Sequence, residues 1–336
     1  MPTEPRIDHG RVMFEKVDPS LEDVARGDDP VVSVIIPAHN AADTIGLQLE
    51  SLAVQRTDVP FEVIVVDNAS TDDLAAVVEP FRDRLDVRIV RADERRGAAY
   101  ARNAGIREAR AEMLFFCDAD DSVDPFAIEN TRRTLEELAV FSGSAIPAAP
   151  DVMDRGLEGA RSIAPGTETW SAPVPESEGY PILCGGIFGI RRVTALDVGG
   201  MDASFPWGGE DNDLAWRLTR AGHQVLVSKV VSIAYRQRPD GATSARAMFR
   251  AGWSHALLCM RHGIWGRTPA TQGRRWVLEP ARAAGAAVLA LLRPGRASRA
   301  DLAARFALSM GLLLGRLRFS VRAFRPRPLI GAGLDG

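Results

Sequence analysis

Three carboxylates follow directly after an apolar run in the first half of the chain. Asp118, Asp120 and Asp121 come after Met113–Cys117, a segment that fits a buried strand of a parallel sheet. Parallel sheets bind ligands at the carboxyl ends of their strands, and like charges in one turn repel one another unless a cation lies among them. The pattern therefore predicts a hard divalent cation that carries a phosphorylated ligand, with a solvated acidic turn as the alternative.

A second group of acids opens a predicted helix later in the chain. Glu210, Asp211 and Asp213 follow Gly208-Gly209 and precede the apolar positions of that helix. Acids in a first turn interact favourably with the helix dipole, and a capping role suits Asp213 better than Asp211. Helix capping also explains Asp124, which precedes Pro125, but it leaves the three acids before it unexplained.

Alternating strands and helices must position the carboxylates of Asp118, Asp120 and Asp121. Apolar, β-branched runs bounded by turn residues predict buried strands, and apolar positions at helical spacing between them predict helices. The predicted strands are Val31–Ile36, Phe61–Val66, Val87–Val90 and Met113–Cys117. The predicted helices start near Ile45, run from a cap at Ser70 or Thr71 through Phe81, and cover Gly97–Ala109 and Phe126–Leu138. This order is typical of an α/β fold with a mostly parallel sheet and helices on both of its faces.

The pattern is weaker in the next part of the chain. Residues Ile146–Tyr180 contain many Pro, Gly, Ser and Glu residues, which predicts a long loop over the active face. Beyond it we expect an apolar segment at Ile182–Ile190, a helix at Arg191–Asp197, a turn at Gly199–Asp202 and a final strand at Gln224–Ser232.

Length and charge divide the 336 residues into three parts. We expect a polar N-terminal extension at 1–29 without a signal peptide, a catalytic body at 30–238 and a basic helical region at 239–336. Residues 241–336 contain 16 Lys and Arg against 3 Asp and Glu, which leaves 25 basic and 41 acidic residues before them. An acidic body argues against a nucleic-acid substrate. Three widely spaced cysteines in apolar surroundings predict reduced core residues of a cytoplasmic protein.

The order of these motifs resembles the inverting glycosyltransferases of family 2, which have the GT-A fold. The resemblance covers about Val31 to Tyr235. It rests on Pro37-Ala-His-Asn40, Val66-Asp-Asn-Ala-Ser-Thr-Asp72, Arg96-Gly-Ala-Ala-Tyr-Ala-Arg-Asn-Ala-Gly105, Asp118-Ala-Asp120, Gly199-Gly-Met-Asp202 and Glu210-Asp211. Each motif alone is weak, whereas six in the same order are specific.

The resemblance implies a pocket for a nucleotide-sugar donor. Pro37, Asn40 and Asp67 would line the nucleoside pocket, with Asp67 accepting hydrogen bonds from the base or stabilising its own turn. On the next helix the resemblance implies a close backbone approach at Gly97 and pocket-facing side chains at Arg102 and Asn103; the Arg102 guanidinium could pair with phosphate or simply be solvated. His39 replaces the aromatic residue that the family often has, so UDP-, GDP- and TDP-sugars all remain candidates.

The resemblance also assigns the reacting groups. Asp118 would lie near the ribose, and Asp118 and Asp120 would form the metal site for Mn²⁺ or Mg²⁺. Asp211 would be the base that deprotonates the acceptor hydroxyl, with Glu210 as a supporting or acceptor-binding acid. A single displacement with one base inverts the anomeric centre. Trp207 would stack on an acceptor sugar or pack in the core.

The C-terminal region lies beyond the resemblance. Arg246–His262 predicts a basic amphipathic helix, and the apolar stretches Ala281–Leu292 and Leu302–Leu317 are short for bilayer spans. Contact with an anionic membrane surface is one interpretation, and a helical cap or dimer interface is the other. Gln272-Gly-Arg-Arg-Trp276 matches a Q-x-x-R-W motif of processive polysaccharide synthases.

The sequence thus predicts an enzyme that transfers a hexosyl group from a nucleotide diphosphate to a hydroxyl acceptor, such as a lipid-linked glycan or another cell-envelope precursor. We expect it in the cytoplasm, peripheral to the inner face of the cell membrane. The alternatives are a processive synthase, a sugar-phosphate nucleotidyltransferase, for which the expected glycine-rich loop is absent after the first strand, and a catalytically silent binder of nucleotide sugars.

Overall fold

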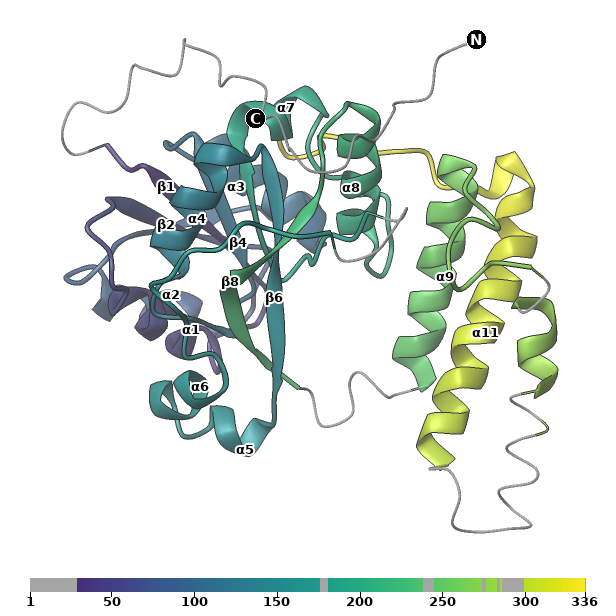
Figure 1. Cartoon of the computed structure of the whole chain (residues 1–336), viewed down its shortest axis with the longest axis horizontal. Coiled ribbons are helices and arrows are strands. Elements are labelled where there is room, and N and C mark those ends of the chain that lie inside the picture. The colour runs from purple at the N-terminus through teal and green to yellow at the C-terminus, as the bar shows by residue number, and fades with distance from the viewer. Residues whose placement is uncertain are drawn as a thin grey trace.

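A computed structural model describes residues 29–175, 181–237, 245–273, 276–282, 285 and 299–335. It shows a body built around one sheet and, beside it, a pair of long helices, α9 (Ala245–His262) and α11 (Arg299–Ser320) (Figure 1). Residues 1–28, most of the predicted stretch Ala281–Leu292 and the predicted domain boundary at 238/239 lie outside the described residues. The division into three domains therefore stays a prediction.

One eight-stranded sheet forms the centre of the body, in the order β3-β2-β1-β4-β7-β6-β8-β5. Strands β1 to β4 are parallel, β7 is antiparallel to both of its neighbours, and β6 pairs in parallel with β8. The strands are β1 (Val32–Ala38), β2 (Phe61–Asp67), β3 (Asp86–Arg91), β4 (Met113–Cys117), β5 (Ser122–Val123), β6 (Val140–Ala148), β7 (Ile187–Arg191) and β8 (Leu226–Arg236). The predicted α/β class with a mostly parallel sheet is confirmed.

Helices cover both faces of this sheet, which explains why its central strands are apolar without alternation. Val34 in β1 belongs to a core cluster with Leu49 of α1 (Ile45–Ala53) and Leu135 of α4 (Ala127–Glu137). Its neighbour Ile35 points to the other face and clusters with residues of α3 (Ala98–Glu108) and α8 (Glu210–Arg220). The core clusters on the two faces of the sheet together fix the end of β4, after which Asp118, Asp120 and Asp121 follow.

The structure corrects the predicted loop at Ile146–Tyr180. Strand β6 reaches into this range, and the short helices α5 (Pro150–Met153) and α6 (Leu157–Ile163) follow it. The strand mixes small and polar residues with its apolar ones, and α6 buries only Gly159 and Ala160. Neither segment carries the apolar periodicity by which helices and strands are predicted. Residues 176–180 lie outside the described part.

The helix expected to run through Phe81 is shorter than predicted. Helix α2 covers Leu74–Val78, and a 3₁₀ turn at Glu79–Phe81 follows it. Pro80 explains this break, because its ring nitrogen cannot donate the next helical hydrogen bond. The N-cap of helix α2 is Asp73, whose carboxylate accepts a hydrogen bond from the Ala76 N–H. The predicted caps were Ser70 or Thr71. Helix α7 (Arg192–Asp197) agrees closely with its predicted position, whereas strand β8 overlaps its predicted range and extends beyond Ser232 to Arg236.

Glycines hold α9 and α11 unusually close together. A Cβ on Gly252 would lie 2.2 Å from the Leu308 carbonyl oxygen, and a Cβ on Gly311 would lie 2.2 Å from that of Phe249. The predicted basic helix is confirmed as α9, and the stretch Leu302–Leu317 lies within α11. Within the described residues, no helix has the length and apolar character needed to cross a bilayer.

A buried carboxylate joins this helix pair to the body. Asp202, in the predicted Gly199–Asp202 turn, is fully buried and forms an ion pair with Arg261 of α9. Its Oδ1 accepts hydrogen bonds from Ser204 N–H at 2.9 Å and from Leu329 N–H at 2.8 Å. The chain after α11 therefore returns to the sheet domain, where Leu334 packs against the core.

Candidate active site

A cavity of about 950 Å³ opens at the carboxyl ends of β1 and β4. Both groups of acids singled out in the sequence contribute to its wall, although they lie about 90 residues apart in the chain. The predicted site residues that line it are Pro37, Asn40, Gly97, Arg102, Asp118, Asp120, Glu210 and Asp211. The fold thus brings the metal-binding candidates and the candidate base into one space.

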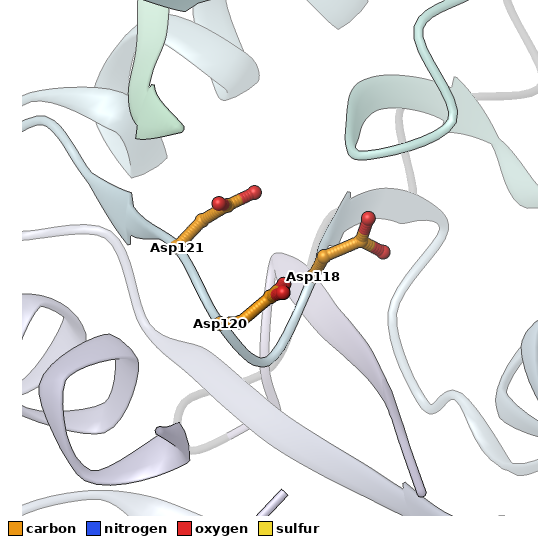
Figure 2. Close-up of side chains that lie close together, drawn as sticks. All are labelled: Asp118, Asp120 and Asp121. Carbon is orange, nitrogen blue, oxygen red and sulfur yellow. The ribbon is translucent and has the colours of Figure 1, made fainter. Parts of the chain in front are cut away.

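Asp118, Asp120 and Asp121 lie on the turn between β4 and β5 with their carboxylates on the same side (Figure 2). One carboxylate oxygen from each of the three lies within 4.8 Å of the others. The set contains only oxygen ligands, which are the ligands that Mg²⁺ and Mn²⁺ prefer. These residues therefore fit a hard divalent cation, and Asp121 joins the two acids that the resemblance named.

Neighbouring elements fix this acidic turn from both sides. The Arg236 N–H of β8 donates to Asp121 Oδ1 at 2.9 Å, and the Arg236 guanidinium donates to the Asp120 carbonyl at 3.2 Å. Asp124 accepts from the Ser232 N–H at 2.7 Å and from the Phe126 N–H at 2.8 Å. Burial raises the pKa of Asp124 to about 6, against the lowering effect of these hydrogen bonds. The turn is held in place before any ligand binds.

Glu210 and Asp211 stand at the start of α8, after Gly209 in the left-handed conformation at φ 97°. Burial raises the pKa of both carboxyls, and their mutual repulsion adds to the effect on Glu210, while Arg102 opposes it. Asp211 accepts hydrogen bonds from the Gly185 N–H at 3.1 Å and the Asn212 N–H at 2.7 Å. A buried carboxyl with a raised pKa is suited to accept a proton near neutral pH.

Arg102 connects the two acid groups, and this contact was not predicted. Its guanidinium donates to Asp118 Oδ1 at 2.8 Å and to Glu210 Oε1 at 3.2 Å. Burial alone would lower the pKa of Arg102, but the carboxylates of Asp118, Glu210 and Asp211 outweigh this effect and raise it. The sequence suggested that Arg102 binds a phosphate, whereas in the structure its guanidinium forms ion pairs with two carboxylates.

Two glycines that were not predicted as site residues separate the acids. A Cβ on Gly185 would lie 2.9 Å from Asp211 Oδ2, and a Cβ on Gly186 would lie 3.0 Å from Asp118 Oδ2. The backbone of this pair therefore packs between the candidate base and the metal-binding turn. The Cys184-Gly185-Gly186 sequence before β7 was the available signal.

Neither Asn103 nor Asp67 lines the cavity, and their predicted pocket roles stay predictions. The fully buried Asn103 accepts from the Met201 N–H at 2.8 Å and donates to the Met201 and Ala332 carbonyls, each at 2.9 Å. It secures the Gly199–Asp202 turn and the C-terminal segment. Asp67 Oδ1 accepts from the Ser70 N–H at 2.9 Å, which is the turn-stabilising alternative. Its neighbour Asn68 lines the cavity and accepts from the Gly97 N–H at 2.7 Å.

Trp207 contacts helix α9 of the helix pair. Its side chain is exposed, its ring centroid lies 6.1 Å from that of Trp253 in α9, and Arg250 lies over the ring at 5.4 Å. It does not line the cavity, although the adjacent Gly208 does. Core packing is therefore excluded for Trp207, and its predicted sugar contact stays a prediction.

Residues 33–193 match the model of glycosyl transferase family 2, and residues 171–249 match that of the N-terminal domain of galactosyltransferase. The segment 33–193 belongs to glycosyl transferase family 2. The family 2 segment contains the acidic turn, Arg102 and the glycine pair, whereas Glu210 and Asp211 fall within the second match. The resemblance inferred from the motifs is thereby confirmed.

Curated relatives are named for succinoglycan biosynthesis and for sugar transfer. The succinoglycan biosynthesis protein ExoO of Rhizobium meliloti is 37% identical over 147 residues, covering 44% of this chain and 40% of ExoO. Validoxylamine A glucosyltransferase of Streptomyces hygroscopicus subsp. jinggangensis is 30% identical over 236 residues, covering 60% of this chain and 54% of the relative. The chain thus spans about half or less of these proteins.

A solved structure supports the fold of the chain over most of its length. The mannosyltransferase PcManGT from Pyrobaculum calidifontis, in complex with GDP-Man and Mn²⁺, superposes with a TM-score of 0.57 at 23% identity. The superposition covers 87% of this chain and 90% of PcManGT. The GT-A type architecture expected from the motifs is confirmed by this likeness.

Proposed function

We propose that this protein is a metal-dependent, inverting glycosyltransferase that moves a sugar from a nucleotide diphosphate to a hydroxyl acceptor. The observation that carries the proposal is the single cavity whose wall includes both the Asp118–Asp121 turn and Glu210-Asp211. The family 2 match and the relatives named for succinoglycan biosynthesis and for glucosyl transfer support the same reaction. A catalytically silent binder would not need a buried carboxyl with a raised pKa beside the metal-binding acids.

In this proposal Asp118, Asp120 and Asp121 hold the cation. When bound, Mn²⁺ or Mg²⁺ supplies the positive charge that neutralises the departing diphosphate. PcManGT was solved with GDP-Man and Mn²⁺, which supports testing such a donor and metal here. The base of the nucleotide stays open among uracil, guanine and thymine.

Asp211 takes the proton from the acceptor hydroxyl as that oxygen attacks the anomeric carbon. The Gly185 N–H, 3.1 Å from Asp211 Oδ2, orients the carboxylate without adding a second charge. Arg102 holds Glu210 and Asp118 in position through its two ion pairs. One base and one displacement invert the anomeric centre, so an α-linked donor gives a β-linked product.

The competing activities receive less support from the described residues. Gln272 and Trp276 line neither this cavity nor the one beside it, and Trp276 packs edge-to-face against Trp265 with ring centroids 5.0 Å apart. The two arginines between them, 274 and 275, lie outside the described residues. The described residues of the motif therefore contact neither cavity, which gives a processive synthase role no support from the site. The family 2 match favours a transferase over a nucleotidyltransferase.

We further propose that the helix pair contacts the inner face of the cell membrane from the cytoplasm, bringing the enzyme to a lipid-linked acceptor. Phe306, Leu314 and Leu317 of α11 are exposed, and their spacing puts them on one side of the helix. The exposed Arg318 lies beside them. Apolar side chains bordered by arginines suit an anionic surface.

A flotation assay with anionic liposomes tests this membrane contact. The double variant Phe306→Asp/Leu317→Asp should lose flotation, whereas Val193→Asp, at an equally exposed apolar position on the body, should keep it. Equal flotation of the double variant and the wild-type chain would remove the membrane proposal without affecting the transferase reaction.

The transferase proposal is tested by release of nucleoside diphosphate from a panel of UDP-, GDP- and TDP-sugars in the presence of Mn²⁺. One of these donors should be turned over. Asp120→Ala should abolish the part of nucleoside diphosphate release that depends on Mn²⁺. Glu158→Ala, at an exposed acid of α6, is the matched control and should behave as wild type. If every donor is left intact in the presence of a range of acceptors, the proposal fails.

A further inference from the structure

A second cavity of about 590 Å³ adjoins the first. Both are lined by Arg96, Gly97, Ala98, Gly208 and Glu210, so they meet at the start of α8. The second cavity extends from there along the start of α3 to the C-terminal segment that returns after α11. A molecule in it would lie on the side of Glu210 away from the acidic turn, because none of the three turn acids lines it.

Three arginines give the second cavity a positive wall. Arg95 and Arg96 come from the segment before α3, and Arg327 comes from the returning C-terminal segment. All three are exposed, and none forms an ion pair with another described residue, in contrast to Arg102, which pairs with two carboxylates. Glu210 is the one acid in this wall, and it is occupied by Arg102. These guanidinium groups are therefore available to an anion.

The start of α3 adds backbone donors to the same wall. The helix has eleven residues, begins at Ala98 after Gly97, and has no side chain capping its first turn. Ala98, Ala99 and Tyr100 all line the cavity, and the first amides of a helix have no acceptor within the helix. Helix amides together with free guanidinium groups favour phosphate over a neutral group.

The donor's own diphosphate does not account for this arrangement. On the proposed function, that diphosphate lies with the cation at Asp118 and Asp120, which line only the first cavity. A nucleotide sugar seated there points its anomeric carbon towards Asp211, and the acceptor enters from beyond Glu210. An anionic group in the second cavity therefore belongs to the other substrate.

We infer that the acceptor of this enzyme carries a phosphate, which binds between Arg95, Arg96 and Arg327 while its reacting hydroxyl reaches Asp211. This inference rests on the proposed transferase function and specifies the acceptor class. The phosphate could belong to a soluble sugar phosphate or to the link between a sugar and a lipid. Both present the same group to the same arginines.

The test uses the full chain, a donor that it turns over and three acceptors built on one hexose. They are its neutral methyl glycoside, its 1-phosphate, and the same hexose joined through diphosphate to a short isoprenyl chain in detergent. Wild-type enzyme should show a KM for both phosphate-bearing acceptors at least tenfold below that for the glycoside, because charged groups strengthen hydrogen bonds to phosphate; tenfold corresponds to about 1.4 kcal/mol. A further preference for the isoprenyl acceptor identifies a lipid as the source, and equal use of the two identifies a soluble one.

The double variant Arg95→Gln/Arg327→Gln then tests the residues. In this variant the KM for the methyl glycoside divided by the KM for a phosphate-bearing acceptor should be close to one. Arg155→Gln, which removes an exposed arginine of the α5–α6 segment, should keep the wild-type ratio. The inference would be overturned if the wild-type enzyme turned over the donor with a KM ratio already near one. It would also be overturned if the double variant kept the wild-type KM ratio. Absence of turnover with any donor would instead refute the proposed function.

Discussion

The guanidinium of Arg102 lies 2.8 Å from the carboxylate of Asp118, and these two residues stand on elements that the sheet brings together, α3 and the end of β4. The same guanidinium lies 3.2 Å from Glu210 at the start of α8. One buried cation thus neutralises an acid of the metal-binding turn and an acid beside the candidate base. The separation between the two halves of the site depends on it.

Replacing Arg102 should reduce both stability and activity. Arg102→Ala leaves Glu210, which is largely buried, without its cation, and loss of one partner from a buried pair costs about 3 kcal/mol. Because Arg102 lowers the pKa of Glu210 and Asp211, its loss should raise both values further. A base works when ionised, so the acidic limb of the kcat/KM profile should move to higher pH.

Thermal denaturation and a pH profile measure these two effects. Arg102→Lys should retain part of the stability, because one ammonium keeps the charge but loses the planar fork. Arg155→Ala, on the surface, should change neither quantity. A pH profile of Arg102→Ala that coincides with the wild-type profile would show that the guanidinium does not control the base.

Gly185→Ala should damage catalysis more than folding. Its Cβ would lie 2.9 Å from Asp211 Oδ2, so the carboxylate must move from its position against the Gly185 N–H. Displacement of a base by about 1 Å can cost about a hundredfold in kcat. Gly46→Ala is the control, since its Cβ would meet only Val77 Cγ1 at 3.8 Å. Equal kcat values in the two variants would contradict the positioning role of Gly185.

The parts of the fold that follow from local pattern were predictable. Strand β4 was placed at Met113–Cys117 from its apolar run, and the acids after it were recognised because three like charges in one turn need a counter-charge. Most of the candidate site follows from those acids and from the order of the motifs. Strand β6 was missed, since its alternation is interrupted by Gly143 and by small polar residues.

Contacts between distant segments were not predictable in the same way. Asn103 sits in a motif that suggests a ligand pocket, yet its partners are Met201 and Ala332, which lie far away in the sequence. The double contact of Arg102 likewise depends on how α3 faces α8. No periodicity encodes such pairings, because they arise only when the sheet order places the elements side by side.

Acid should destabilise the helix pair through His255. Burial lowers the pKa of this histidine to about 4, whereas an unfolded histidine has a value of 6.5. As the pH falls from 6.5 to 4, the unfolded chain takes up a proton that the folded chain refuses, so stability falls through this window and levels off below it. The loss amounts to at most about 3 kcal/mol.

His255→Gln should flatten this dependence, because glutamine can still meet the Thr268 hydroxyl, 2.8 Å from the imidazole, and does not titrate. Denaturant unfolding at pH 7 and pH 4.5 measures the difference. His223→Gln, in the turn after α8, serves as the control. The burial argument fails if His255→Gln and wild type lose the same free energy of unfolding between these pH values.

Gly311→Leu should separate α11 from α9. A Cβ at this position would already lie 2.2 Å from the Phe249 carbonyl oxygen, so any larger side chain forces the backbones apart. We expect a loss of roughly 3 kcal/mol in the free energy of unfolding, as for overpacked interiors. Leu314→Ala, at an exposed position of the same helix, should be nearly neutral. Similar melting temperatures for both variants would argue against the close helix contact.

The most direct test of the account compares Asp211→Asn with the wild-type chain in two assays, sugar transfer and donor binding in the presence of Mn²⁺. Asparagine keeps the size of the side chain but cannot take the proton, so transfer should fall by about a hundredfold or more while the dissociation constant of the donor stays within a few-fold. Asp120→Ala should weaken donor binding as well. Transfer by Asp211→Asn at the wild-type rate would contradict the assignment of the base, and with it the central claim that this cavity joins a metal-held donor to a proton-accepting carboxylate.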